Sequence, residues 1–168
     1  MAKLQRSALI TFLQAPFAAT LASTQSWFKI GKDVADMSVN LNPDTETVKN
    51  ILDETNVNDN GYEPSFDVDT YYADPSDGDF YDDIKSISLD RLKGDECKTI
   101  CMEVLVDKTT GPFDAWIEDC IVKPQSYGGA QGGVRFPYNV AFCGNRKKGT
   151  VTFDSTTGAP TFTAASGG

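Results

Sequence analysis

The feature that most constrains the fold of this chain is the alternation of apolar and polar side chains along its second half. Residues 134–143 show it most clearly, and residues 99–106 and 113–123 repeat it. Successive side chains of a β-strand point to opposite faces, so this period predicts strands that each bury one face. Further strands are predicted at residues 66–72, at residues 149–154 after a turn at 144–148, and as two short strands within residues 27–40.

Residues 79–93 carry the pattern of an amphipathic helix. Phe80, Ile84 and Ile87 fall on one stripe, and acidic residues occupy the first turns, where the helix dipole is positive. Ser76 or Asp77 is expected to cap the start of this helix. Together with the strands, the helix predicts a mainly β fold, an antiparallel β-sandwich or open barrel with one packed helix.

The stretch before the strand at residues 66–72 is expected to be exposed. Residues 42–46 predict a turn, and residues 56–61 predict a polar loop. Between them, Val48, Ile51 and Leu52 permit one or two helical turns, although a strand is compatible with them as well.

A chain of 168 residues is expected to form one compact domain. We assign residues 27–154 to it, with residues 1–26 as an N-terminal arm and residues 155–168 as a mobile C-terminal tail. The start of the chain resembles a weak secretory signal, but Thr11, Gln14 and Pro16 interrupt its apolar stretch. We therefore favour an arm that docks on the fold or on a neighbouring molecule. No apolar run approaches the roughly 20 residues that cross a bilayer, so no membrane partner is expected.

The residue types argue against an enzyme. Histidine is absent, which removes the commonest general base and the commonest neutral metal ligand. Asn56, Asn58, Asn60 and Asp67 imitate the spacing of a calcium loop, but the first and last ligands differ from the usual ones and no flanking helices are predicted. No phosphate loop, nucleophile elbow or dinucleotide fingerprint occurs, so no catalytic residue, metal or cofactor is expected.

The four cysteines do not predict a metal site either. Cys97 and Cys101 lack zinc-ribbon spacing, and no second close pair accompanies them. We interpret the cysteines as buried reduced thiols, while a disulfide that involves Cys120 or Cys143 stays open.

Charge is unevenly distributed. The chain has 24 acidic and 15 basic residues, a net charge of −9. Residues 53–83 contain no lysine or arginine, while both ends of the chain are mildly basic. This acidic stretch is either a solvated surface, a face that meets the basic ends of like copies, or a face that repels a polyanion.

Several short motifs, taken in order, resemble one family. They are residues 42–46 (NPDTE), residues 61–68 (GYEPSFDV), Asp74-Pro75 leading into the helix, the strand at 99–106, the glycine-rich segment before Phe136, and the closing residues 149–153 (GTVTF) and 161–163 (TFT). Over roughly residues 28–162 the sequence resembles the major tail tube proteins of long-tailed, siphovirus-type bacteriophages.

That resemblance implies a structural virion protein. Such proteins have a β-sandwich with one flanking helix and form hexameric rings, in which the sheets close into a larger barrel. The rings stack into the tail tube, the conduit for DNA ejection. The resemblance also implies a tape-measure protein, a tail terminator and a distal tail protein as partners. It further implies assembly in the host cytoplasm and a final location in the virion tail. Tubes of contractile tails and of type VI secretion share the fold.

The resemblance also implies which residues act. In this family the long loop after the first strands reaches adjacent rings, and here it corresponds to about residues 42–62. Our candidates for this contact are Asn42, Pro43, Asp44, Glu46, Asn58, Asn60 and Tyr62. We further hypothesise that acidic side chains dominate the lumen, so that DNA passes without specific binding. The lumen-facing candidates are Asp67, Asp69, Glu103 and Glu118.

Two alternatives remain. One is a secreted or surface β-sandwich that binds glycan or protein, supported by the weak signal and the cysteines. The other is a tube subunit of a contractile tail or tailocin.

Overall fold

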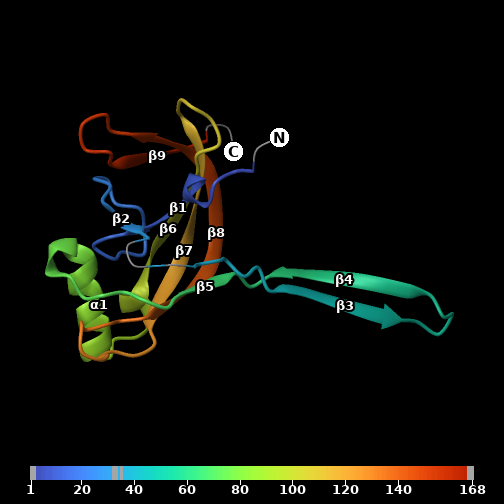
Figure 1. Ribbon diagram of the computed structural model, residues 1–168. Helices are drawn as coiled ribbons and strands as arrows, with labels where there is room; N and C mark the ends of the chain where they lie inside the picture. Colours follow the sequence, from blue (N-terminus) through green and yellow to red (C-terminus); the bar gives the residue numbers. More distant parts are fainter. Residues whose placement is uncertain (1–2, 32–33, 35, 166–168) are drawn as a thin grey trace.

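The fold is built on one curled antiparallel sheet with a long hairpin projecting from it (Figure 1). The computed structural model describes residues 3–31, 34 and 36–165. The strands of the large sheet follow the order β2-β1-β6-β7-β8-β5, and β9 pairs with β8. Their bounds are β1 Leu9–Gln14, β2 Trp27–Ile30, β5 Ser65–Val68, β6 Lys98–Leu105, β7 Phe113–Pro124, β8 Tyr138–Phe153 and β9 Pro160–Ala164.

The remaining elements lie around this sheet. β3 (Pro43–Lys49) and β4 (Thr55–Tyr62) form a separate two-stranded sheet, and α1 covers Asp79–Leu89. Three short 3-10 helices span Arg6–Ala8, Pro75–Asp77 and Gly94–Cys97. In the described part of the chain, no helix is both long and apolar enough to cross a bilayer.

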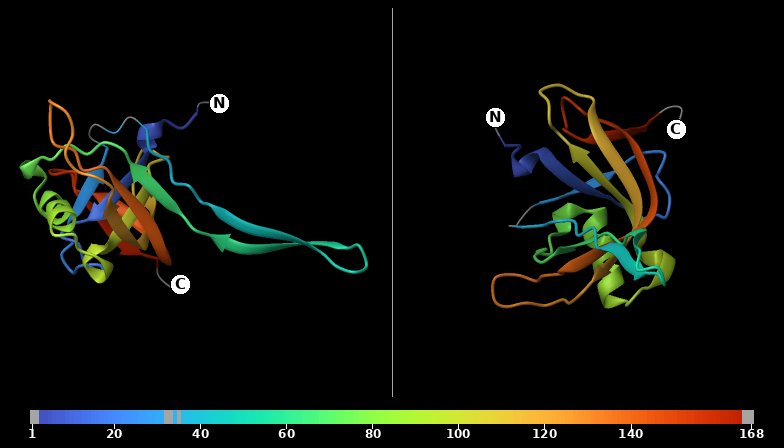
Figure 2. Two further views of the ribbon diagram at one scale, coloured as in Figure 1. Left: turned by 90° about the horizontal axis from the view of Figure 1, so that it is seen from below. Right: turned by 90° about the vertical axis from the view of Figure 1, so that its right-hand side faces the viewer.

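The longest strand, β8, joins the two halves of the sheet. It has 16 residues, pairs with β7 along most of its length, and holds β5 at its start and β9 at its end. The β7–β8 register shifts between Ile117 and Asp119 and again between Asp119 and Cys120. Such bulges bend a strand and increase its twist, and the sheet accordingly curls into a half-barrel (Figure 2).

Two apolar cores use alternate residues of the same strands. Leu13 of β1 and Cys101 of β6 belong to a core with Phe80 and Ile84 of α1. Their neighbours Phe12 and Met102 belong to a second core with Val151 and Phe162, from β8 and β9. Since consecutive strand residues point to opposite faces, β1 and β6 are buried on both sides, which makes them interior strands.

Helix α1 is held against the sheet by aromatic packing. The Phe80 ring is fully buried and stacks on Phe28 of β2 at 3.9 Å between centroids, and it meets the edge of Tyr71 at 5.1 Å. Asp79 and Asp82 lie in the first turn, as expected. The predicted capping was wrong, however, because Gly78 is the N-cap and neither Ser76 nor Asp77 caps the helix.

The mainly β fold with one packed helix is confirmed, but several boundaries change. The expected arm at residues 1–26 contains β1, an interior strand between β2 and β6, and the expected tail at 155–168 contains β9. Thr11 and Gln14, which appeared to interrupt an apolar stretch, are buried in β1. Thr99 Oγ1 donates a hydrogen bond to the Gln14 carbonyl at 2.8 Å, an interaction between distant segments that leaves no local signature.

Other differences have similar causes. The predicted turn at 144–148 lies inside the continuous strand β8, and the predicted loop at 56–61 lies inside β4. The helix ends at Leu89 rather than near residue 93, and Arg91 already has a positive φ of 54°. Of the two strands predicted within 27–40, β2 forms; the described residues 34 and 36–39 are not in a strand, and residues 32, 33 and 35 lie outside the described chain.

A substitution at Gly149 tests how β9 is seated on β8. A Cβ atom added at Gly149 would lie 2.6 Å from Phe162 Cζ and would also clash with the Thr163 carbonyl oxygen. We expect Gly149→Ala to lower the free energy of unfolding by about 1–3 kcal/mol. The clashing Thr163 carbonyl belongs to the backbone of β9, which cannot move aside as the end of a flexible side chain can. Urea titration measures this. Gly31→Ala is the control, since its added Cβ would meet no heavy atom of the described residues within 4 Å, its chain neighbours aside. Equal stability of the two variants would contradict the packing of β9 described above.

A second substitution tests the packing of α1. Phe80→Ala removes a fully buried ring that contacts Phe28, Tyr71 and Tyr138. We expect a loss of about 3–5 kcal/mol in the free energy of unfolding. Leu89→Ala on the same helix is the control, because Leu89 is 51% exposed and should cost well below 1 kcal/mol. A small effect of Phe80→Ala in thermal or urea unfolding would show that α1 does not depend on this contact.

Candidate functional site

The most distinctive surface is the β3–β4 hairpin, which extends away from the body on the side opposite α1 (Figures 1 and 2). Its register pairs Glu46 with Asn58 and Lys49 with Thr55. Every residue of the hairpin from 43 to 62 is exposed except Gly61, which is half-buried. The hairpin therefore makes almost no contact with the rest of its own chain.

The base of the hairpin is fixed to the large sheet. Asn40 and Ser65 exchange two backbone hydrogen bonds of 2.8 and 3.0 Å. Asn42 has a positive φ of 45°, and its Nδ2 donates to the Glu63 carbonyl oxygen at 3.0 Å. Asparagine tolerates this backbone region better than most residues, so Asn42 sets the direction in which the hairpin leaves the sheet.

The tip of the hairpin is an ordered turn. Asn50 Oδ1 accepts hydrogen bonds from the backbone N–H groups of Leu52 at 2.8 Å and Glu54 at 3.1 Å. Asn50 Nδ2 donates to Glu54 Oε2 at 2.8 Å. This turn presents Ile51 with its whole surface exposed and Leu52 with 72% exposed.

An isolated two-stranded hairpin is marginally stable in water. This one also exposes four apolar side chains, Val48, Ile51, Leu52 and Val57. Exposed apolar groups gathered on a projecting element are typical of a surface that another protein covers. The hairpin is therefore the candidate assembly surface.

The structure brings the predicted contact residues together on this hairpin. Asn42 lies at its base, Pro43, Asp44 and Glu46 lie on β3, and Asn58, Asn60 and Tyr62 lie on β4. Their role in contacting a neighbouring ring stays a prediction. The sequence interpretation missed Asn50, Ile51 and Leu52 at the tip, although the apolar pair Ile51-Leu52 between polar residues was a usable signal.

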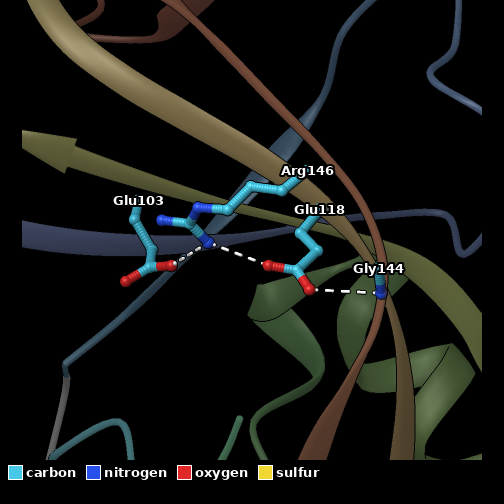
Figure 3. A network of polar contacts seen from close by, with 4 residues as sticks. All are labelled: Glu103, Glu118, Gly144 and Arg146. Carbon is cyan, nitrogen blue, oxygen red and sulfur yellow. Dashed lines mark hydrogen bonds and ion pairs between the residues drawn. The ribbon is translucent and has the colours of Figure 1, made fainter. Parts of the chain in front are cut away.

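Two of the predicted lumen residues share one cation (Figure 3). Arg146 Nη1 lies 3.0 Å from Glu103 Oε1 and 2.9 Å from Glu118 Oε1. Glu118 Oε2 accepts a hydrogen bond from the Gly144 backbone N–H at 3.1 Å, beside the bulge in the β7–β8 pairing. The Glu118 carboxylate thus satisfies a backbone donor and holds Arg146 as well.

The network keeps a net negative charge. Glu118 is 6% exposed, and a single cation, Arg146, pairs with both Glu118 and Glu103. Burial works against the charged Arg146 guanidinium, but the hydrogen bonds that it donates to Glu118 and Glu103 outweigh burial and raise the pKa of Arg146. Arg146 Cζ and Lys148 Nζ both lie over the Trp116 ring, at 5.9 and 5.7 Å from its centroid.

The other two lumen candidates lie elsewhere. Asp67 is exposed, and Asn139 Nδ2 donates to its Oδ1 at 2.7 Å. Its neighbours Phe66 and Val68 are buried in the core, so Asp67 points away from that core. Asp69 is exposed just beyond the end of β5. The four acids therefore form no single cluster, and their placement in a lumen stays a prediction.

The cysteines carry no disulfide. All four are free, and Cys97, Cys101 and Cys120 are buried. Burial raises the pKa of the Cys101 and Cys120 thiols well above the usual value, which keeps them protonated and unreactive. The interpretation of buried reduced thiols is confirmed for these three, while Cys143 is exposed.

Comparison with known proteins points to one fold. No family model matches the sequence, and a comparison with curated proteins finds no match. Among solved structures, the SPP1 tail tube is similar with a TM-score of 0.57 and 15% identity, covering 87% of this chain and 78% of that one.

Two further similar structures are components that terminate tubes. The tube-terminating cap of the anti-feeding prophage has a TM-score of 0.50 and 13% identity, covering 89% of this chain and 93% of that one. The sheath/tube terminator of the extracellular contractile injection system PVC, in its extended state, has a TM-score of 0.50 and 10% identity, covering 88% of this chain and 97% of that one. The chain therefore has the tail tube fold.

Proposed function

We propose that this protein is a structural subunit of a phage tail tube. Copies of the chain associate into hexameric rings, and the rings stack into a hollow tube through which DNA passes. The observation that carries this proposal is the hairpin of residues 43–62, an ordered projection that its own chain leaves almost wholly exposed. A monomer gains little from such an element, whereas a stacked assembly uses it as a connector.

The borders of the large sheet support association within a ring. β2 ends the sheet on one side, and no other described strand pairs with its outer edge. An unpaired edge strand is a template for pairing with another chain, and closing a sheet with neighbouring copies removes the edge. In the proposed ring, the half-barrels of neighbours join into one larger barrel.

The opposite border consists of β5 and β9, which pair with the two ends of β8, and β9 is partly protected in the single chain. The side chain of Gln25 contacts β9 twice, because its Nε2 donates to the Phe162 carbonyl at 2.9 Å and its Oε1 accepts from the Phe162 N–H at 2.8 Å. This amide occupies the edge of β9 and blocks indiscriminate strand pairing there. The edges of β2 and β5 are thereby left for pairing in the ring.

We infer that the channel is acidic. The net charge of −9 disfavours adhesion of a polyanion, and the electrostatic attraction that dominates DNA binding requires clustered cations. Because Arg146 offsets one of the two charges of Glu103 and Glu118, the exposed Asp67 and Asp69 contribute more to this charge. DNA then passes without specific binding.

The partners follow from the same proposal. A tape-measure protein would occupy the tube during assembly in the host cytoplasm, and a tail terminator and a distal tail protein would close its ends in the virion tail. No enzymatic activity is part of this role.

A second candidate function is that of a tube terminator. The similarity to a tube-terminating cap and to a sheath/tube terminator supports it, and the second of these comes from an extracellular contractile injection system. A terminator forms a single ring, whereas a tube subunit forms stacked rings. A tube subunit of a contractile tail also stays compatible with the fold. The secreted-module alternative is disfavoured, because signal cleavage near residue 23 would remove the interior strand β1.

Negative-stain microscopy of the purified protein tests the proposal directly. At high protein concentration we expect rings with a central hole or tubes built from them. Single rings alone would favour the terminator role. Dispersed monomers, alone and after mixing with tail-tip proteins from the same virus, would overturn both.

Arg146 is expected to be needed for stability of the proposed channel subunit. Arg146→Met leaves the buried Glu118 carboxylate without its cation, and we expect a loss of about 1–3 kcal/mol, less than for a fully buried pair because Arg146 is 42% exposed. Urea titration measures the loss. Lys148→Met is the matched control, since Lys148 lies over the same Trp116 ring and its loss leaves no buried carboxylate uncompensated.

Adding Glu118→Gln to Arg146→Met removes the unpaired charge and should recover part of the stability. Equal stability of Arg146→Met and Lys148→Met would contradict the role of the ion pair.

A further inference from the structure

A groove at the end of α1 carries a concentration of positive charge. It has a volume of about 300 Å³ and lies between the last turn of the helix and the segment that follows β7. The charged residues that line it, Arg91, Lys93 and Lys123, are all basic. The carbonyl end of a helix carries only about half a negative charge, so three cations exceed what the helix itself attracts.

A buried polar group in the wall of this groove lacks a partner. Ser88, which lines the groove, is 8% exposed, and its Oγ makes no hydrogen bond within the described chain. Lys123 is held in place, because its Nζ lies 3.2 Å from the Leu92 carbonyl and 3.7 Å from Cys97 Sγ.

The hairpin tip has the complementary composition. Ile51 and Leu52 are exposed apolar residues, and Asp53 and Glu54 follow them directly. The hairpin from residue 43 to 62 contains five acidic residues and one basic residue, a net charge of −4. The groove supplies apolar contacts as well as cations, since Ile87, Leu92 and Tyr127 are among its lining residues.

Two other hollows fit the tip less well. The hollow at the base of the hairpin is lined by Glu63 and Glu118, whose charges would repel an acidic tip. The groove beside β1 and β2 is lined by Arg6, Lys29 and Asp36, so its net charge is smaller. Of these three surfaces, charge complementarity selects the groove at the end of α1.

The positions of tip and groove determine the type of assembly. The hairpin and α1 lie on opposite sides of the body (Figures 1 and 2), so the tip cannot reach the groove of its own chain. A hairpin of this length spans roughly 25 Å, at about 3.3 Å per strand residue, which suffices to reach a neighbouring copy. When two identical copies associate through two different surfaces, the pair keeps one free tip and one free groove. Further copies can bind to these, so the contact repeats around a closed ring or along an open stack.

We propose that the hairpin tip, Ile51–Glu54, docks into the groove at the end of α1 of a second copy. Ile51 and Leu52 contact Leu92 and Tyr127, while Asp53 and Glu54 pair with Arg91 and Lys93. This inference rests on the proposed tube function and adds to it the surface that receives the hairpin.

Charge exchange tests the contact. We expect Glu54→Lys and Lys93→Glu each to raise the concentration needed for half-maximal assembly by about tenfold, measured by light scattering and microscopy. The double variant, Glu54→Lys with Lys93→Glu, restores the opposite charges and should return assembly close to that of the unmodified protein. Lys108→Glu is the control for the groove, and Asp107→Lys, at an exposed position outside the hairpin, is the control for net charge.

Cross-linking provides a second, independent measurement. In a Cys143→Ser background, which removes the exposed native thiol, Leu52→Cys with Lys93→Cys should yield a ladder of disulfide-linked multimers under mild oxidation. Each single-cysteine variant should give dimers at most, and Leu52→Cys with Lys108→Cys should give no ladder.

The outcomes separate the two proposals. If the unmodified protein forms neither rings nor tubes, the proposed function fails and this contact with it. If the unmodified protein assembles, but Glu54→Lys and Lys93→Glu assemble equally well and no ladder forms, the docking contact alone is overturned. Circular dichroism and urea titration of each variant confirm that it is folded.

Discussion

The pairing of β7 with β8 is the contact on which the rest of the structure depends. β8 is the longest strand, and it carries β5 at one end and β9 at the other. Where the register shifts near Asp119, the ladder would leave the Gly144 N–H unpaired, and the Glu118 carboxylate accepts its hydrogen bond instead. The Glu118 carboxylate is an anion in a nearly buried position, so it requires a cation nearby. Arg146, two residues beyond Gly144 on the same strand, supplies this cation. The bend of the sheet and this ion pair are therefore linked, because the bulge leaves a backbone N–H without a ladder partner. Glu118 accepts its hydrogen bond, and Arg146 compensates the charge of Glu118.

The bend in turn determines which surfaces remain for partners. A curled sheet with apolar residues on both faces of β1 and β6 needs cover on both faces, which α1 and β9 provide within the chain. What the chain leaves uncovered is the outer edge of β2 and the whole β3–β4 hairpin. A fold that buries its cores internally but leaves an edge and a projection unpaired is suited to association without refolding, since no core has to open when copies meet. The similarity to the SPP1 tail tube, at 15% identity, is a similarity of fold.

How far the sequence predicted this structure depends on how local each signal was. β7 and the two ends of β8 were predictable because one of their faces is buried, so apolar and polar residues alternate. β6 is buried on both faces and was predictable from its run of apolar residues. The middle of β8 was not, because Arg146 and Lys148 resemble a polar turn until their partners Glu103, Glu118 and Trp116 are known from other strands. β1 was mistaken for part of an arm, since Thr11 and Gln14 look polar in sequence but are buried. The hairpin strands gave no alternation because both of their faces are exposed, so the resemblance to tail tube proteins, rather than periodicity, identified residues 42–62 as the contact region.

The hairpin also shows why self-association has to be selective. A ribbon with exposed Val48, Ile51, Leu52 and Val57 would aggregate if apolar contact alone governed its pairing. Its net charge of −4 opposes contact between two hairpins, since like charges at close range repel. The same charge favours a basic surface, and in a chain of net charge −9 such surfaces are scarce, which leaves the groove with Arg91, Lys93 and Lys123 as a distinctive target. Because the attraction joins two different surfaces on opposite sides of the body, each docking event leaves a free tip and a free groove at the ends of the growing assembly. Apolar contacts alone would let the hairpin bind many surfaces. Electrostatic attraction restricts it to the basic groove, so that the assembly grows in one direction.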